Sequence, residues 1–233
     1  MPKPQQDLFL SLQGAIGSDR LAAYRRGDTD KDVLTRYLWN TALSESLYPV
    51  LQYLEIGLRN NLHNAISTVY SPTWYDRQPS ILEHDQQRMV SDAKQKLQRS
   101  HKPLTTGRIV AELTFGFWTS LFNRRYEVRP NGTPVLWPTL LAPVFPHVPR
   151  SLRTRHEMSR RLTDIRVLRN RVFHHEPIWH DPKLRDKYNE IVEMTRWISG
   201  DLFDMALLLD RFPTVYVNGQ SLCQSQVSRL VIP

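Results

Sequence analysis

Apolar residues recur at three- and four-residue steps along much of this chain, and this spacing constrains the fold more than any other feature. Such spacing places apolar side chains on one face of a helix, where they pack against a core. Two stripes show it most clearly: Leu51, Leu54, Leu58, Leu62 and Ile66, and Leu162, Ile165, Leu168 and Val172. Each stripe predicts a helix that is buried along one side.

The second of these helices is expected to end just before Pro177. Proline cannot continue a helix, and it disfavours helical geometry at the preceding residue, Glu176. His174 and His175 are therefore expected in the last turn. The partial negative charge of a helix C-terminus favours a protonated imidazole at that place.

The polar face of this helix carries the pattern R-N-x-x-x-H, formed by Arg169, Asn170 and His174. Asn170 and His174 lie roughly opposite the apolar stripe, and Arg169 lies between the two faces. Imidazole transfers protons in both directions near neutral pH, and guanidinium matches phosphate oxygens. An amide orients a neighbouring group by hydrogen bonding. The three side chains suit attack by an RNA 2′-hydroxyl on its adjacent phosphate, whereas plain helix capping by the histidines is the structural alternative.

Three blocks carry a family resemblance: LEIGLRN at 54–60, ELTFGFW at 112–118 and IRVLRNRVFHHEPIW at 165–179. In this order they resemble the Abi-like (abortive infection) proteins, a branch of the HEPN superfamily, over roughly residues 15 to 200. The resemblance implies an all-α fold, a HEPN-type helical bundle with additional helices. It also implies frequent dimerisation, metal-independent RNA cleavage at an R-x4-6-H site, and a place in phage defence or toxin–antitoxin systems.

The resemblance also distributes roles over the motif and its surroundings. The catalytic residues it implies are Arg169, Asn170 and His174. The supporting residues it implies are His175, Glu176, Glu55, Arg59 and Asn60. Glu55 and Arg59 are four residues apart on a helix and can pair, although a surface ion pair of little consequence is the alternative. Arg59 and His63 form a second, shorter R-x3-H pattern that fits the family less well.

An arginine-rich stretch precedes the motif and predicts contact with RNA. The side chains expected to bind RNA are Arg153, Arg160, Arg166 and Arg171. The whole chain has 31 Lys and Arg against 23 Asp and Glu, a formal net charge of +8. A basic balance suits a polyanionic partner, although some of these arginines serve only to solvate the helix.

A homodimer with a shared site is expected for the active form. In-line transfer requires a base at the attacking oxygen and an acid at the leaving oxygen. The chain has only one full motif, which supplies one histidine for these two roles. A two-fold axis near His174 would place a second copy opposite the first. The alternative is a monomer whose second proton carrier is His175, His63 or water. An RNA or protein antitoxin is a further expected partner.

Metal and nucleotide-hydrolysing chemistry are disfavoured. His174, His175, Glu176, His180 and Asp181 are close in sequence, but no H-E-x-x-H and no cysteine pair occurs. Adjacent histidines on a helix point about 100° apart and rarely converge on one ion. No P-loop pattern is present either. Neither a metal nor a cofactor is therefore expected.

Several features favour a cytoplasmic protein. No apolar run approaches the roughly 18–20 residues needed to cross a bilayer, and no membrane association is expected. The first residues lack the apolar core of a signal peptide. Cys223 is the only cysteine, so no disulfide can form within the chain, which agrees with a reducing compartment.

The chain is expected to form a single domain over residues 1–211 with a tail over 212–233. Residues 1–17 predict an extended start followed by a short apolar segment, and Pro49 is expected to begin a new helix. Residues 108–123 predict one central apolar helix. The proline-rich segment 124–150 predicts a surface loop with a short helix near 139–142, and residues after Pro213 predict a strand or a flexible tail.

The function predicted on this basis is that of a metal-independent endoribonuclease, a hydrolase-type toxin or abortive-infection effector in antiviral defence. It would leave 2′,3′-cyclic phosphate ends. Two alternatives stay open: a non-catalytic RNA-binding HEPN module, and a structural dimer within a defence or toxin–antitoxin complex. Substitution of His174 separates the first from catalysis, and the absence of RNA affinity identifies the second.

Overall fold

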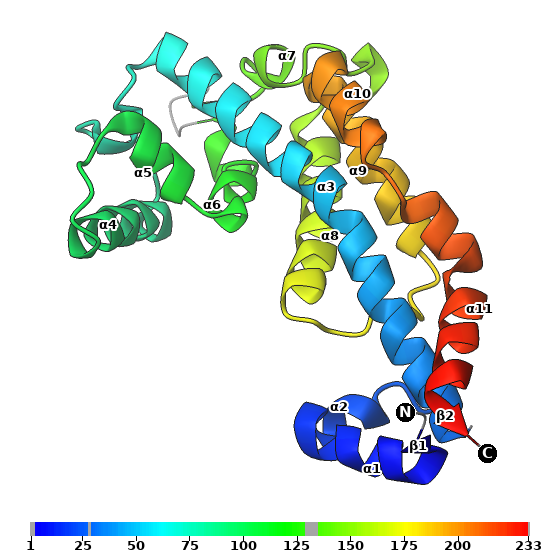
Figure 1. Cartoon of the computed structure of the whole chain (residues 1–233). Coiled ribbons are helices and arrows are strands. Elements are labelled where there is room, and N and C mark those ends of the chain that lie inside the picture. The colour runs from blue at the N-terminus through cyan, green and yellow to red at the C-terminus, as the bar shows by residue number, and fades with distance from the viewer. Residues whose placement is uncertain (1–2, 28, 129–134, 233) are drawn as a thin grey trace. The chain divides into compact units, whose positions relative to one another are not determined.

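The computed structural model describes residues 3–27, 29–128 and 135–232, and over these residues the fold is all-α, as expected (Figure 1). The helices are α1 Gln5–Ile16, α2 Ser18–Ala22, α3 Asp30–Val69, α4 His84–Arg99, α5 Thr106–Glu112, α6 Phe115–Ser120, α7 Leu141–Val144, α8 Arg155–Phe173, α9 Leu184–Ile198, α10 Gly200–Leu208 and α11 Phe212–Leu230. Short 3-10 helices are η1 Trp74–Asp76, η2 Arg124–Tyr126 and η3 Arg150–Leu152. Within the described part of the chain, no helix is both long and apolar enough to cross a membrane.

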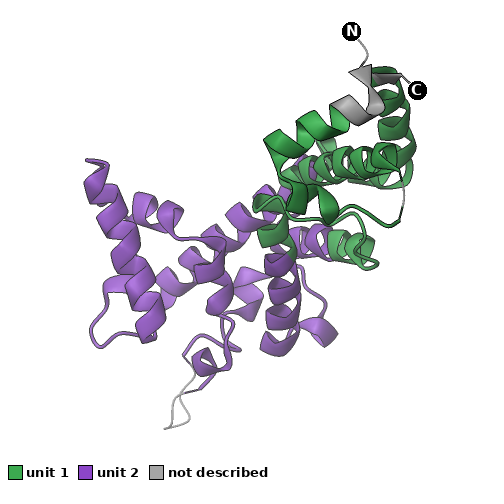
Figure 2. Cartoon of the chain, turned by 90° about the horizontal axis from the view of Figure 1, so that it is seen from below, with its two compact units in different colours: residues 1–50, 168–189, 207–233 green, residues 51–167, 190–206 purple. Residues whose placement is uncertain are grey.

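The chain divides into two compact units, which Figure 2 shows in different colours. Unit 1 comprises residues 1–50, 168–189 and 207–233. Unit 2 comprises residues 51–167 and 190–206. The long helices α3, α8 and α9 each contribute residues to both units, so each unit is built from segments distant in the sequence. The boundary expected at residue 211 falls within unit 1, between α10 and α11.

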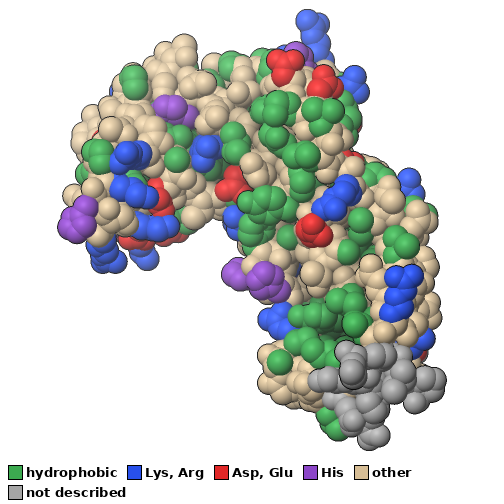
Figure 3. Space-filling view, viewed as in Figure 1, with side chains coloured by type: hydrophobic (Ala, Val, Ile, Leu, Met, Phe, Trp, Pro, Cys, Tyr) green, Lys and Arg blue, Asp and Glu red, His purple; other side chains and the backbone are tan. Residues whose placement is uncertain are grey.

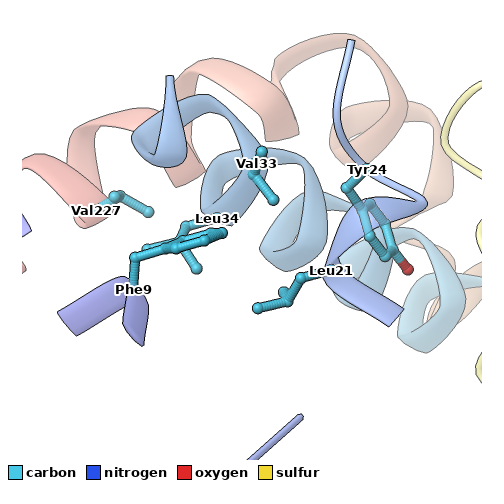
Figure 4. Packing of buried hydrophobic residues seen from close by; sticks show 6 residues of the cluster. All are labelled: Phe9, Leu21, Tyr24, Val33, Leu34 and Val227. Atoms are coloured by element: carbon cyan, nitrogen blue, oxygen red, sulfur yellow. The ribbon is translucent and has the colours of Figure 1, made fainter. Parts of the chain in front are cut away.

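Unit 1 has its own core, formed where α1 and α2 pack on the beginning of α3. The buried cluster there consists of Phe9, Leu21, Tyr24, Val33, Leu34 and Val227 (Figure 4). Residues 5–16 are thus helical, and the expected extended start is wrong for them. The segment around Phe9 is helical because its apolar residues pack into this core. The two-residue strands β1 Lys3–Pro4 and β2 Val231–Ile232 pair in parallel, which brings the two ends of the described chain together.

Helix α11 replaces the strand or flexible tail expected after Pro213. Its buried residues Gly219, Cys223 and Val227 recur at four-residue steps, the period of a helix face. A Cβ at Gly219 would lie 2.7 Å from Cδ1 of Trp39, so only glycine allows this approach to α3. The Trp39 indole also donates to the carbonyl of Val215 at 3.0 Å. Packing on α3, which local sequence alternation does not encode, selects the helix.

Helix α3 runs without a break for 40 residues, so the expected start of a new helix near Pro49 is wrong. An interior proline costs a helix about 3 kcal/mol, because it removes one backbone hydrogen bond and crowds the preceding turn. The buried apolar residues continue on both sides of Pro49, including Leu43, Leu47, Val50 and Leu51. Their burial offsets that cost, and the expected stripe from Leu51 to Ile66 is buried throughout.

In unit 2, the expected helix over 108–123 is two helices, α5 and α6, with a break at Leu113 and Thr114. Thr114 is the N-cap of α6, and its hydroxyl accepts from the backbone N–H of Phe117. A local cap of this kind satisfies a free amide at a helix start and competes with a continuous helix. Phe117 and Trp118 still pack in the core against Trp74, as their apolar character predicts.

In the described part of the proline-rich segment 124–150, the prolines are exposed but most large apolar residues are buried, so the expected surface loop is wrong for those apolar residues, whereas the expected short helix is present as α7. The Trp137 ring stacks on Phe122 with centroids 4.4 Å apart, and its indole donates to the carbonyl of Leu121 at 2.7 Å. Helix α7, which follows Trp137 in the same unit, buries Leu141 and Val144. Pro143 lies within α7, and most of the large apolar residues between the prolines are buried. Residues 129–134 lie outside the described part of the chain.

Candidate active site

The R-N-x-x-x-H motif lies at the C-terminal end of α8, in unit 1. The apolar stripe of this helix is buried along its whole length, which leaves Asn170 and His174 exposed on the other side. Arg169 is half-buried, and its guanidinium carbon lies 4.3 Å from the centre of the Phe173 ring. The exposed amide and imidazole are therefore neighbours on one face of the helix, with the guanidinium held along the helix beside them.

The chain leaves α8 through a turn in which His175 adopts a left-handed conformation, with φ of 58°. The amide of His175 donates to the carbonyl of Val172 at 3.2 Å, and that of Glu176 donates to the carbonyl of Arg171 at 2.8 Å. This pair of hydrogen bonds is the Schellman motif, which satisfies carbonyls at a helix end. His174 keeps a helical hydrogen bond to Asn170, whereas His175 lies past the helix and not in its last turn as expected.

Two arginine side chains, Arg20 of α2 and Arg171 of α8, bind carbonyl oxygens of this turn. Arg20 of α2 donates from its guanidinium to the carbonyl of His175 at 2.8 Å. Arg171 of α8 donates to the carbonyl of Pro177, and its Nε lies 3.6 Å from a carboxylate oxygen of Glu176. Both bonds end on carbonyls that no helix hydrogen bond would otherwise satisfy. Arg171, expected to bind RNA, thus has a structural role at the turn, and its RNA contact stays a prediction.

A buried asparagine fixes the chain that follows the turn. The Asn40 side-chain oxygen accepts from the amides of Ile178 at 2.6 Å and Trp179 at 3.1 Å. Its amide nitrogen donates to the carbonyl of Glu176 at 3.5 Å. Asn40 is 4% exposed, and a buried amide in a low-dielectric site holds its partners strongly. Asn40 is not among the site residues predicted from the sequence, although a lone asparagine among apolar residues at helical spacing on α3 is typical of such a buried contact.

Trp179, the last residue of the third sequence block, anchors this segment to α3. Its ring lies within 5.2 Å of the Arg36 guanidinium and 5.5 Å of the Arg26 guanidinium. It also stacks on Tyr24 and contacts Trp39. Guanidinium groups over an indole face are attracted by its ring quadrupole. The motif turn is therefore supported by aromatic and cationic contacts as well as by hydrogen bonds.

Two further histidines, His180 and His63, have lowered pKa values. Partial burial, with the positive charges of Arg26 and Arg171, lowers the pKa of His180, so its neutral form is favoured. In unit 2, burial lowers the pKa of His63, whose Nδ1 accepts from the Trp74 indole at 3.1 Å. That hydrogen bond needs the unprotonated nitrogen and ties the ring to the core. The second R-x3-H pattern therefore has its histidine engaged in packing.

The supporting residues expected from the first block lie on the part of α3 that belongs to unit 2. Glu55 and Arg59 are half-buried, and Asn60 is exposed. The Nε of Arg59 donates to the side-chain oxygen of Asn60 at 3.4 Å. The expected pairing of Glu55 with Arg59, and the support of these residues for catalysis, stay predictions.

The arginines expected to bind RNA before the motif also belong to unit 2. Arg160 is bound by three carboxylates, those of Glu157 at 2.9 Å, Glu190 at 3.1 Å and Asp164 at 3.4 Å. Arg153 donates to the carbonyl of Val148 at 3.2 Å, and Arg166 is half-buried on α8. The carboxylates around Arg160 neutralise its charge locally, which weakens the attraction it offers to a phosphate.

Figure 3 shows where basic side chains gather on one face of the molecule, with a group over α4 in unit 2. On α4, Lys94 pairs with Asp76 and Lys96 pairs with Glu112. Among the described residues, no cluster of three or more His, Cys, Asp or Glu side chains has the arrangement of a metal site. The motif region therefore offers an imidazole, an amide and a guanidinium as its chemical groups.

Comparison with known proteins gives one match. A family model described as Abi-like protein matches residues 8–180, well over half of the chain, and this range contains all three sequence blocks. No curated protein and no solved structure was found to match the chain. The chain therefore belongs to the Abi-like protein family, and this membership indicates a role in abortive-infection defence.

Proposed function

We propose that this protein is a metal-independent endoribonuclease of the HEPN type, with Arg169, Asn170 and His174 as its catalytic residues. The observation that carries the proposal is the exposure of Asn170 and His174 side by side at the end of α8, on a turn held by Asn40 and Arg20. Catalytic groups need this combination, because a reactive side chain must be accessible while its backbone stays fixed.

The reaction follows from the chemistry of the three groups. A neutral imidazole of His174 takes the proton of an RNA 2′-hydroxyl, and the 2′-oxygen attacks the adjacent phosphorus. The bond from phosphorus to the 5′-oxygen breaks, and a second proton carrier, acting as an acid, donates a proton to that oxygen. The products are a 2′,3′-cyclic phosphate and a 5′-hydroxyl. Arg169 offsets the negative charge that grows on the phosphate oxygens, and Asn170 orients the substrate by hydrogen bonding.

A homodimer would supply the second proton carrier as His174 of a second copy. One feature of unit 1 supports an interface at this place. Tyr48 of α3 is 50% exposed and Phe173 of α8 is 39% exposed, and their ring centroids are 5.7 Å apart. Exposed aromatic side chains beside a functional group are typical of protein interfaces. Their burial between two copies would offset part of the repulsion between the arginines of the two motifs.

In the cell, such an enzyme would act as a toxin or abortive-infection effector that cleaves RNA after phage infection. An RNA or protein antitoxin would then hold it inactive until the trigger arrives. Family membership supports the defence role, and the net charge of +8 supports an RNA substrate.

The test is an incubation of purified protein with total RNA in excess EDTA, with His174→Ala beside the wild type. Wild-type protein should cleave, and the ends should be 2′,3′-cyclic phosphate and 5′-hydroxyl. His174→Ala should lose cleavage by at least about a hundredfold, the usual size of a general acid–base contribution, with unchanged helicity. Cleavage lost in EDTA and restored by Mg²⁺ or Zn²⁺ would reject the mechanism.

A further inference from the structure

A hollow lies beside the motif turn, and the cleavage chemistry described above does not use it. It is lined by Arg20 and Ala23 at the end of α2 and by His175, Glu176 and Pro177 of the turn, all within unit 1. Its volume is about 320 Å³. This volume lies at the lower end of the range for small-ligand sites, so the hollow suits one compact planar group.

Three of the residues that line the hollow, Arg20, His175 and Pro177, carry a planar or ring group. The guanidinium of Arg20 is tied to the carbonyl of His175 at 2.8 Å, which limits the rotation of its plane. The Schellman turn fixes the backbone of His175, and Asn40 holds the carbonyl of Glu176. Single-stranded RNA is recognised by stacking its splayed bases on His rings and Arg planes. An imidazole, a guanidinium and a proline ring around one hollow give that kind of surface.

The carboxylate of Glu176 at the edge of the hollow favours some bases over others. Glu176 is exposed at the hollow, and its carboxylate accepts hydrogen bonds but donates none when ionised. Adenine, cytosine and guanine carry an exocyclic amino group that can donate to it, whereas uracil has none and carries a carbonyl where cytosine has its amino group. The Nε of the nearby Arg171 lies 3.6 Å from this carboxylate, and Arg171 does not itself line the hollow.

We propose that this hollow binds the base of one nucleotide of the RNA substrate and prefers a base that carries an exocyclic amino group. The inference deepens the proposed function and rests on it for the place of the base along the RNA. His175 follows His174 directly in the chain, so the hollow and the proposed catalytic imidazole belong to the same turn, and the base would belong to a nucleotide near the phosphate that is cleaved. The binding itself requires no cleavage and is testable alone.

The experiment titrates cytidine and uridine monophosphates into the full-length protein and follows binding by calorimetry. Inorganic phosphate serves as a third ligand, which reports binding through the phosphate alone. Ala23→Leu fills the hollow and should weaken cytidine monophosphate binding at least tenfold. Ala22→Leu is the matched control, because Ala22 is exposed on α2 and does not line the hollow, and its affinity should equal that of the wild type.

Two further variants test the named contacts. Glu176→Gln should abolish the preference for cytidine over uridine monophosphate, because the amide both donates and accepts. Arg20→Lys keeps the charge but loses the planar face, so it should weaken both nucleotides. Melting curves of all variants establish that they are folded, and Arg20→Lys tests the hollow even if Ala23→Leu does not fold.

The outcomes separate this proposal from the ribonuclease assignment. Equal affinity for the two nucleotides, binding of inorganic phosphate as tight as cytidine monophosphate, or indifference to Ala23→Leu would overturn the base site. Protein that binds cytidine monophosphate through the hollow but does not cleave RNA would support the base site and reject the ribonuclease. Protein that cleaves RNA yet binds neither nucleotide would do the reverse.

Discussion

His175 holds the left-handed position at the end of α8, where glycine is the usual residue. The Cβ of an L-residue costs about 1–2 kcal/mol in this conformation, and a branched Cβ costs more. We therefore expect His175→Gly to raise the free energy of unfolding by about 1 kcal/mol and His175→Val to lower it. Urea unfolding of the three proteins measures both changes. Equal stability of the glycine and valine variants would contradict the left-handed turn.

Asn40 is the second residue whose role can be measured directly. Its replacement by alanine leaves the amides of Ile178 and Trp179 buried without an acceptor, and each such loss costs about 1–3 kcal/mol. Asn40→Ala should therefore lower the free energy of unfolding by at least that amount and reduce RNA cleavage together with it. Thr41→Ala, at the next and exposed position of α3, is the control and should change stability little. A stable Asn40→Ala protein would show that the turn is held by other contacts.

At the scale of a single element, α8 carries a carboxylate whose ionisation matters for stability. Hydrogen bonds from Arg160 and Arg161 lower the pKa of Glu157 from 4.5 to about 2. Because the folded pKa lies below the unfolded one, the unfolded chain binds the proton first as the pH falls. The stabilisation is therefore complete above about pH 4.5 and is lost as the pH falls towards 2.

The matching experiment measures unfolding free energy at several pH values for wild type and Glu157→Gln. The wild type should lose more stability than the variant between about pH 4.5 and 2, because the variant has no proton to take up there. Parallel curves for the two proteins would mean that the carboxylate contributes no pH dependence to α8.

At the scale of the whole molecule, the prediction concerns the homodimer that we propose as the form with a complete site. We expect sedimentation to give the mass of two chains, and Tyr48→Glu to shift the equilibrium towards the monomer by placing a charge among exposed aromatic residues. Arg169→Ala and His174→Ala chains should each be inactive, and their mixture should recover part of the cleavage activity if each centre takes groups from both copies. Asp204→Asn is an exposed control for Tyr48→Glu and should keep the dimer. A fully active monomer would end the dimer proposal.

The sequence by itself determined the buried faces of the two helices whose apolar residues recur most regularly, the second half of α3 and α8. The stripes from Leu51 to Ile66 and from Leu162 to Val172 are buried as their spacing predicts, because the facing of a helix depends only on residues three and four apart. It also placed the end of α8 before Pro177, since proline blocks a helix locally. The exposure of Asn170 and His174 follows from the same two facts.

Only the tertiary structure decided what holds the candidate site and where the remaining chain packs. Asn40 contacts residues more than a hundred positions away, and no local pattern identifies that partner. The packing of α11 through Gly219 against Trp39, and the burial of Trp137 within the proline-rich segment, likewise depend on distant surfaces. The left-handed His175 is a residue that local preference disfavours, and it persists because hydrogen bonds from Arg20 and within the turn fix its backbone. Local spacing sets the buried faces of α3 and α8, whereas contacts between distant segments decide the packing of α1 and α11 and what supports the motif.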